Sequence, residues 1–204
     1  MVYLNLPLLY DNFEFNKIFS KYILENRYAL KFPFQIESTY GSFPYCCWNG
    51  DLNSTYGNNI LYPEIEKLIL DYRESVIRLD FSNIFLNNND FYNIHENTIL
   101  KLLESNGTII ELSNLELFNY INSKYKGYDF VLSSNANLIH PLTENIINVF
   151  MEQNEFILIS LNNYDNLDLT KIKNKNKLEI LINNECLNCS SETQLKCKLL
   201  EQNN

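Results

Sequence analysis

The 204-residue sequence predicts one α/β domain with a parallel sheet. Segments that resemble strands begin near residues 34, 76, 108, 129, 156 and 178, and helical patterns separate most of them. This alternation is typical of parallel strands joined by right-handed crossovers. Polar side chains in the middle of one strand favour a (βα) barrel, with an open doubly wound sheet as the alternative. Because eight barrel units need about 250 residues, about six strands predict a partial or distorted TIM-like barrel.

The N-terminal part is expected to form a cap, one strand and a long loop. Residues 1–30 form an N-terminal helical cap, in which apolar side chains at helical spacing predict a helix over 16–27. A strand is expected at 34–38. The irregular segment 39–61 is rich in aromatic residues, and so long a loop in a compact domain is usually functional. A helix over 63–73 begins with a proline, as helices often do.

Strands and helices then alternate to the end of the chain. Asn106-Gly107 is a helix stop, and Asn114 and Thr143 are suitable N-caps. The expected strands are 76–83, 108–112, 129–133, 156–161 and 177–183. The expected helices are 95–104, 114–125, 143–153 and 191–201, with a short helix or turn near Leu169.

The strand at 76–83 carries charge where a buried strand should be apolar. Alternation places Arg78 and Asp80 on one face, and Leu79 and Phe81 on the other. Helices on both sides of a parallel sheet normally bury both faces of its strands. Buried charges are costly unless they are paired or used. The pattern therefore predicts an enclosed polar cavity that contains Arg78 and Asp80.

Composition excludes several classes of protein. The formal net charge of -9 and the pI near 4.7 disfavour nonspecific binding to nucleic acid. No apolar run reaches the roughly 18 residues that span a bilayer, and the N-terminus lacks the basic region of a signal peptide. The 5 cysteines are an odd number in a chain with a real core, so a cytoplasmic location is expected. Glycine-rich nucleotide loops and a nucleophile elbow are absent from the sequence.

The ligand site of either architecture lies at the carboxyl ends of the strands. Arg78 could hold an anionic group. Asp80 and Glu111 could act as acid and base, or bind a divalent ion. Glu37 and Asn83 lie at the carboxyl ends of strands, at the same edge. Ser-Asn pairs after several strands have a plainer explanation, because these residues also cap helices.

Cysteine spacing suggests a metal site. Cys186 and Cys189 form a Cys-x-x-Cys pair with Cys197 further on, and Cys47 lies in the loop after the first expected strand. Thiolates at this spacing can bind zinc or an iron–sulfur cluster. The alternatives are free thiols or a redox pair.

Three segments together resemble a poorly characterised group of bacterial and phage proteins, related to radical-SAM-type barrels and to collagenase-like peptidases. The first is Tyr-Gly-Ser-Phe-Pro-Tyr-Cys-Cys-Trp-Asn-Gly at 40–50. The second is Arg-Leu-Asp-Phe-Ser-Asn at 78–83, and the third is Glu-Ile-Leu-Ile-Asn-Asn-Glu-Cys-Leu-Asn-Cys at 179–189. The resemblance covers most of residues 35–190.

The resemblance implies a TIM-like barrel with a cysteine-bearing rim. It carries the site to residues that match these motifs: Trp48, Asn49, Arg78, Asn83, Asn183, Cys186 and Cys189. The chain departs from the group where Asp51 replaces a second glycine and where Ser190-Ser191-Glu192 replaces a Pro-x-Arg-x-x-His-Tyr tail.

Two hypotheses follow. In the first, the chain is a barrel-like, metal-dependent enzyme that acts on a small anionic substrate. In the second, it is a non-catalytic ligand-binding or assembly module, a degenerate and phage-encoded copy of a barrel enzyme. A second copy or another subunit would then cover an open sheet edge.

Overall fold

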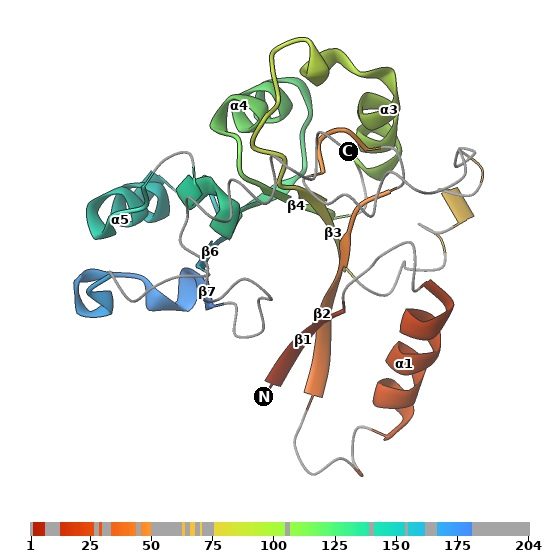
Figure 1. The fold of residues 1–204 in the computed structure, drawn as a ribbon. Helices are drawn as coiled ribbons and strands as arrows, with labels where there is room; N and C mark the ends of the chain where they lie inside the picture. The colour runs from red at the N-terminus through yellow and green to blue at the C-terminus, as the bar shows by residue number, and fades with distance from the viewer. Residues whose placement is uncertain are drawn as a thin grey trace, which may run out of the picture.

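Seven parallel strands form the centre of the structure, a computed structural model (Figure 1). The strands follow one another in chain order, and the sheet curls into a half-barrel. Their bounds are β1 Val2–Leu6, β2 Phe34–Gly41, β3 Val76–Phe81, β4 Ile109–Leu112, β5 Asp129–Leu132, β6 Leu158–Leu161 and β7 Leu178–Ile180. The structure describes residues 2–6, 13–26, 29, 34–43, 46–49, 63, 66–67, 70, 76–104, 107–138, 141–153, 155–161 and 167–180.

The helices lie on the outside of the curled sheet (Figure 1). The α-helices are α1 Phe13–Asn26, α3 Ile94–Leu103, α4 Leu115–Lys124 and α5 Glu144–Gln153. Short 3₁₀ turns are η2 Asp90–Tyr92, η3 Ser134–Leu138, η4 Leu169–Lys171 and η5 Lys175–Lys177. Within the described parts of the chain, no helix combines the length and apolarity that crossing a bilayer requires.

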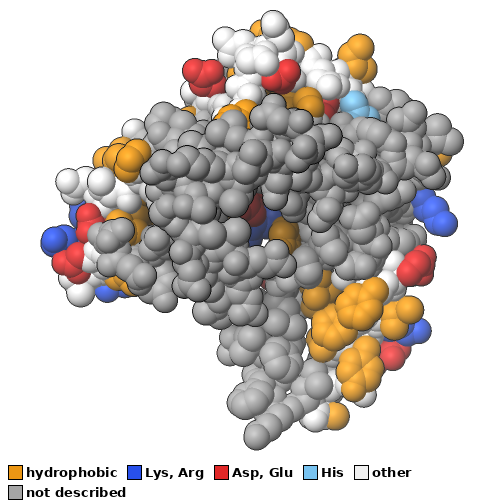
Figure 2. Space-filling view, viewed as in Figure 1, with side chains coloured by type: hydrophobic (Ala, Val, Ile, Leu, Met, Phe, Trp, Pro, Cys, Tyr) orange, Lys and Arg blue, Asp and Glu red, His pale blue; other side chains and the backbone are white. Residues whose placement is uncertain are grey.

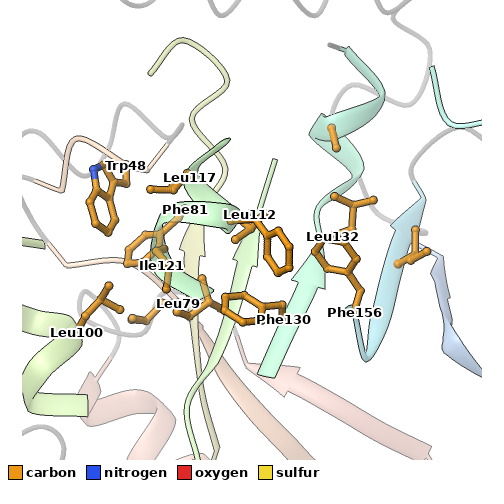
Figure 3. Packing of buried hydrophobic residues seen from close by; sticks show 14 of the residues in the cluster. Trp48, Leu79, Phe81, Leu100, Leu112, Leu117, Ile121, Phe130, Leu132 and Phe156 are labelled. Carbon is orange, nitrogen blue, oxygen red and sulfur yellow. The ribbon is translucent and has the colours of Figure 1, made fainter. Parts of the chain in front are cut away.

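The hydrophobic core fills the space between the sheet and the helices (Figure 3). Leu79 and Phe81 of β3 and Leu112 of β4 are almost completely buried there. They pack with Leu117 of α4 and with Phe130 of β5. Burying one such side chain contributes about 1.5–3 kcal/mol, so the outer face of the sheet supplies most of the packing energy.

Local signals explain where the outer helices begin and end. Asn114 caps α4, because its side chain accepts hydrogen bonds from the backbone N–H groups of Glu116 and Leu117. Asn93 caps α3 in the same way, through His95 N. Gly107 has a φ of 63° in the turn between α3 and β4, a conformation that favours glycine.

The predicted fold class is confirmed, with one strand more than the six expected. The additional strand is β1, which pairs in parallel with β2 in a segment that we expected to belong to a helical cap. Its sequence, Val-Tyr-Leu-Asn-Leu, lacks the polar alternation that usually reveals a strand. The helix expected at 16–27 is α1 and begins three residues earlier. The helix expected at 191–201 lies outside the described residues.

Candidate functional site

The inner face of the curled sheet is polar where its outer face is apolar. We define the inner network as six side chains that are joined by hydrogen bonds: Asn5, Ser38, Arg78, Glu111, Ser160 and Glu179. Six of the seven strands each contribute one of them, and β5 contributes none. Residues far apart in the sequence therefore meet inside the half-barrel.

Arg78 lies at the centre of the inner network and is only 5% exposed. Its Nε donates to Glu111 Oε2 at 3.0 Å, and its Nη2 lies 2.9 Å from the same oxygen. Its Nη1 and Nη2 donate to the two carboxylate oxygens of Glu179 at 3.1 and 2.6 Å. The guanidinium is thus held between two carboxylates, one from β4 and one from β7.

Electrostatics explains why these charges can be buried. Burial alone would lower the pKa of Arg78, but Glu111 and Glu179 outweigh it and raise that pKa. Burial alone would likewise raise the pKa of Glu179, but the hydrogen bonds and charge of Arg78 hold it below its usual range. Arg78 and Glu179 therefore both remain charged at neutral pH.

The inner network also links the two ends of the sheet. Asn5 Nδ2 on β1 donates to Glu179 Oε1 on β7 at 3.1 Å. Ser38 Oγ donates to Asn5 Oδ1 at 2.7 Å, and Ser160 Oγ donates to Glu179 Oε2 at 2.6 Å. Side chains therefore connect the first and last strands across the interior.

Two carboxylates lie side by side above Arg78, toward the carboxyl ends of the strands. Asp80 and Glu111 are register partners on β3 and β4, and both are half-buried. Glu111 uses Oε2 for Arg78, while its Oε1 accepts no hydrogen bond from the described residues. Figure 2 shows acidic and basic side chains at the bottom of a hollow in this face of the molecule.

Serines follow the same strands at the carboxyl-terminal edge. Ser82, Ser113 and Ser133 come directly after the register-paired residues Phe81, Leu112 and Leu132. Strand alternation puts Ser113 on the face of Glu111. The Ser113 hydroxyl is buried, and its Oγ has no hydrogen-bond partner among the described residues. A buried, unsatisfied hydroxyl is costly, and such a group at the end of a barrel strand suggests that a ligand completes it.

The loop after β2 is tied to β3 and α3 beside this edge. Asn83 Nδ2 donates to the carbonyl oxygen of Cys47 at 2.8 Å, and Asn83 N donates to that of Trp48 at 3.0 Å. Cys47 N donates to Glu96 Oε1 at 2.6 Å. The Trp48 indole is fully buried, and its Nε1 donates to the carbonyl oxygen of Asp90 at 2.8 Å. Trp48 and Asn83 therefore hold the loop in place.

The cysteines of this loop are thiols at neutral pH. Burial and then the negative charge of Glu96 raise the pKa of Cys47 to about 12 and raise the pKa of the buried Cys46. Among the described residues, no group of three His, Cys, Asp or Glu side chains is arranged to bind a metal ion. The other predicted ligands, Cys186, Cys189 and Cys197, lie outside those residues.

The structure brings some of the predicted site residues together and separates others. Arg78, Asp80 and Glu111 meet on the inner face as predicted. Glu37 is exposed and lies where the register of β1 and β2 shifts, and it forms none of the hydrogen bonds of the inner network. Asn49 lies in the loop beside Ser42, to which its Nδ2 donates. Asn183 lies outside the described residues.

Sequence reasoning did not select Glu179 as a site residue, although it is the second carboxylate on Arg78. Its pattern was visible, because Glu179 stands between Leu178 and Ile180 as Glu111 stands between Ile110 and Leu112. A single carboxylate between two apolar residues of a short expected strand is the sequence pattern that identifies both Glu111 and Glu179 as candidates for the inner face.

In three comparisons, no family model, no curated protein sequence and no solved structure matches this chain.

Proposed function

We propose that this chain is a barrel-like protein that binds a small polar molecule at the carboxyl ends of β3 and β4. The observation that carries the proposal is the Arg78–Glu111 pair inside the half-barrel, beside the unsatisfied hydroxyl of Ser113. A buried ion pair is seldom favourable for stability compared with apolar residues. The presence of this ion pair in the interior is therefore better explained by a role in ligand binding than by a role in stability.

In this proposal Arg78 positions Glu111 and does not itself hold an anionic ligand. Its N–H groups already bond to Glu111, Glu179 and Ser160, and the two carboxylates beside it would repel an incoming anion. The group left for a ligand is Glu111 Oε1, which is an acceptor. The ligand class is therefore a molecule with amine or hydroxyl donors, in place of the anionic substrate expected from the sequence.

A second candidate function is acid–base catalysis at the same place, favoured by the adjacent carboxylates of Asp80 and Glu111. Two neighbouring carboxyl groups can divide the roles of acid and base. Both roles use the same site. Whether the ligand is released unchanged or chemically altered distinguishes binding from catalysis.

A metal-dependent version of this function rests on Cys47 together with Cys186, Cys189 and Cys197, in line with the resemblance to radical-SAM-type barrels. A bound metal would stabilise the thiolate of Cys47 against its raised pKa. Metal analysis of anaerobically purified protein tests it. Stoichiometric zinc or iron that is lost in Cys186→Ser supports a metal centre. If the wild type contains no metal and Cys186→Ser leaves its stability unchanged, this version of the function is removed.

The test of the binding proposal is a titration followed by NMR, with the Arg78 Nε–H signal as a reporter inside the site. Ethylammonium and glycerol are the donor probes, and acetate and phosphate are the anionic probes, all at millimolar concentration. The donor probes are expected to shift the Arg78 Nε–H and the Ser113 amide signals. Shifts confined to exposed amides with every probe would contradict the proposal.

The matched variants are Glu111→Gln and Glu116→Gln, which remove one carboxylate each from β4 and from the exposed side of α4. Only the first should abolish the shift produced by the donor probes. If anionic probes alone shift the Arg78 signal, a ligand site is present but our choice of ligand class is wrong.

A further inference from the structure

Helix α1 presents an apolar stripe to solvent on the outside of the sheet. Phe15, Ile18 and Tyr22 are 61%, 68% and 54% exposed. At 100° per residue these three positions share one side of the helix. The opposite side, with Asn16 and Ile23, is buried. Figure 2 shows the hydrophobic patch over α1 at the lower right of the view.

Phe19 extends the stripe along the same side of α1. The rings of Phe15 and Phe19 are stacked, with centroids 5.7 Å apart and planes inclined by 11°. In a monomer, isolated exposed apolar residues are ordinary, but a contiguous apolar patch marks an interaction site. We infer that α1 is a homodimer interface, in which two copies of the chain pair their α1 helices in antiparallel orientation. This inference is independent of the proposed function.

A second copy fits the stripe because the charges at its border are self-complementary. Glu14 and Lys21 lie along the same border of the stripe, one near each end. In an antiparallel pair related by a two-fold axis, each border meets its own copy with the direction reversed. A pair centred near Ile18 therefore places Glu14 of each copy beside Lys21 of the other. In a parallel pair the same border would lie on opposite sides of the interface in the two copies, so Glu14 and Lys21 would not meet.

Lys21 is available for this contact. Its present partner is Glu25 in the next turn, with Lys21 Nζ 3.8 Å from Glu25 Oε1, and both side chains are well exposed. Such a surface pair contributes at most about 1 kcal/mol, so it can be exchanged for Glu14 of a second copy at little cost.

The size of the patch sets the expected strength of the dimer. Fully buried aromatic side chains remove about 150–250 Å² each from solvent, so the half-exposed stripe offers roughly 300–400 Å² per copy. The total of roughly 600–800 Å² is below the 1,200–2,000 Å² of a stable complex. The dimer should therefore be weak and depend on protein concentration.

Sedimentation velocity of the full-length chain, from low to several hundred micromolar, tests the inference. We expect the sedimentation coefficient to rise with concentration toward that of a dimer. Ile18→Glu should leave only monomer, while the control Leu24→Glu should not, because Leu24 is equally exposed (59%) but lies off the stripe. Circular dichroism confirms that both variants are folded.

Charge reversal sharpens the test. Glu14→Lys or Lys21→Glu alone should weaken the dimer, and the two together should restore it. A monomer at every concentration overturns the inference, and so does a dimer that Ile18→Glu leaves intact or that Leu24→Glu weakens to the same extent.

Discussion

The two faces of β3 and β4 belong to the same strands but differ in chemistry: the outer face is apolar and the inner face is charged. The outer face presents Leu79, Phe81 and Leu112 to the helices, and these side chains are almost fully buried. The inner face presents Arg78 and Glu111, which are also largely buried but charged. The outer face can be explained by stability alone. The inner face cannot, since equal burial of apolar residues would serve stability at least as well.

The largest effect is expected where one charge of the inner face is left without its partner. Arg78→Ala removes the cation between Glu111 and Glu179 and should lower the free energy of unfolding by about 3–5 kcal/mol. Urea denaturation measures it. A loss below about 1 kcal/mol, the range of exposed pairs, would mean that the inner face is solvated and that the contrast between the faces is smaller than the structure indicates.

A core truncation on the outer face should follow closely. Leu112→Ala should cost about 2–5 kcal/mol, because it removes buried apolar surface and leaves a cavity beside Leu117 and Phe130. The same urea experiment measures it. The exposed Leu24→Ala is the matched control, and equal losses in the two variants would show that Leu112 is not packed in a core.

Replacing all three charged side chains at once separates their role in ligand binding from their role in stability. The triple variant Arg78→Met, Glu111→Leu and Glu179→Leu leaves no unpaired charge on the inner face. It should be clearly more stable than Arg78→Ala and close to the wild type, while losing the NMR response of the Ser113 amide to donor probes. A triple variant as unstable as Arg78→Ala would indicate that the ion network is structural.

The smallest effect is a dependence of stability on pH. Because the pKa of Glu179 is lowered in the folded state, the unfolded chain binds its proton first as pH falls. The contribution of Glu179 is therefore complete above the unfolded value of about 4.3 and is lost as pH falls through the folded pKa. Glu179→Gln should flatten the decline of stability below about pH 5. Thermal unfolding from pH 7 to pH 3 measures it, and parallel curves for the two proteins would contradict the prediction.

The sequence predicts the inner face well at β3 and β4 and poorly at β1 and β7. Arg78 and Asp80 stand out because charge interrupts an apolar strand, and Glu111 stands out for the same reason. Their meeting with Glu179 and Asn5 depends on how far the sheet curls, which is a property of strand tilt and crossover packing. No local pattern gives that curvature, so the sequence does not predict that Glu179 and Asn5 meet Arg78.

The N-terminus shows a second limit of sequence reasoning. Polar alternation reveals a strand only when one of its faces is wet, and β1 is mostly apolar apart from Asn5. The long loop after β2 was predicted to be functional from its aromatic content. The structure shows that Trp48 packs edge-on against Phe81 at a centroid distance of 5.2 Å, so burial in the core also explains this residue.

A double-mutant cycle between Arg78 and Glu179 tests the inner network most directly. The variants are Arg78→Met, Glu179→Gln and their combination, each measured by urea denaturation. The structure joins these side chains by two hydrogen bonds across the half-barrel, and we predict a coupling energy of at least about 1.5 kcal/mol. A coupling energy of zero would mean that β3 and β7 do not meet through these charges, and it would contradict the inner network that surrounds the proposed site.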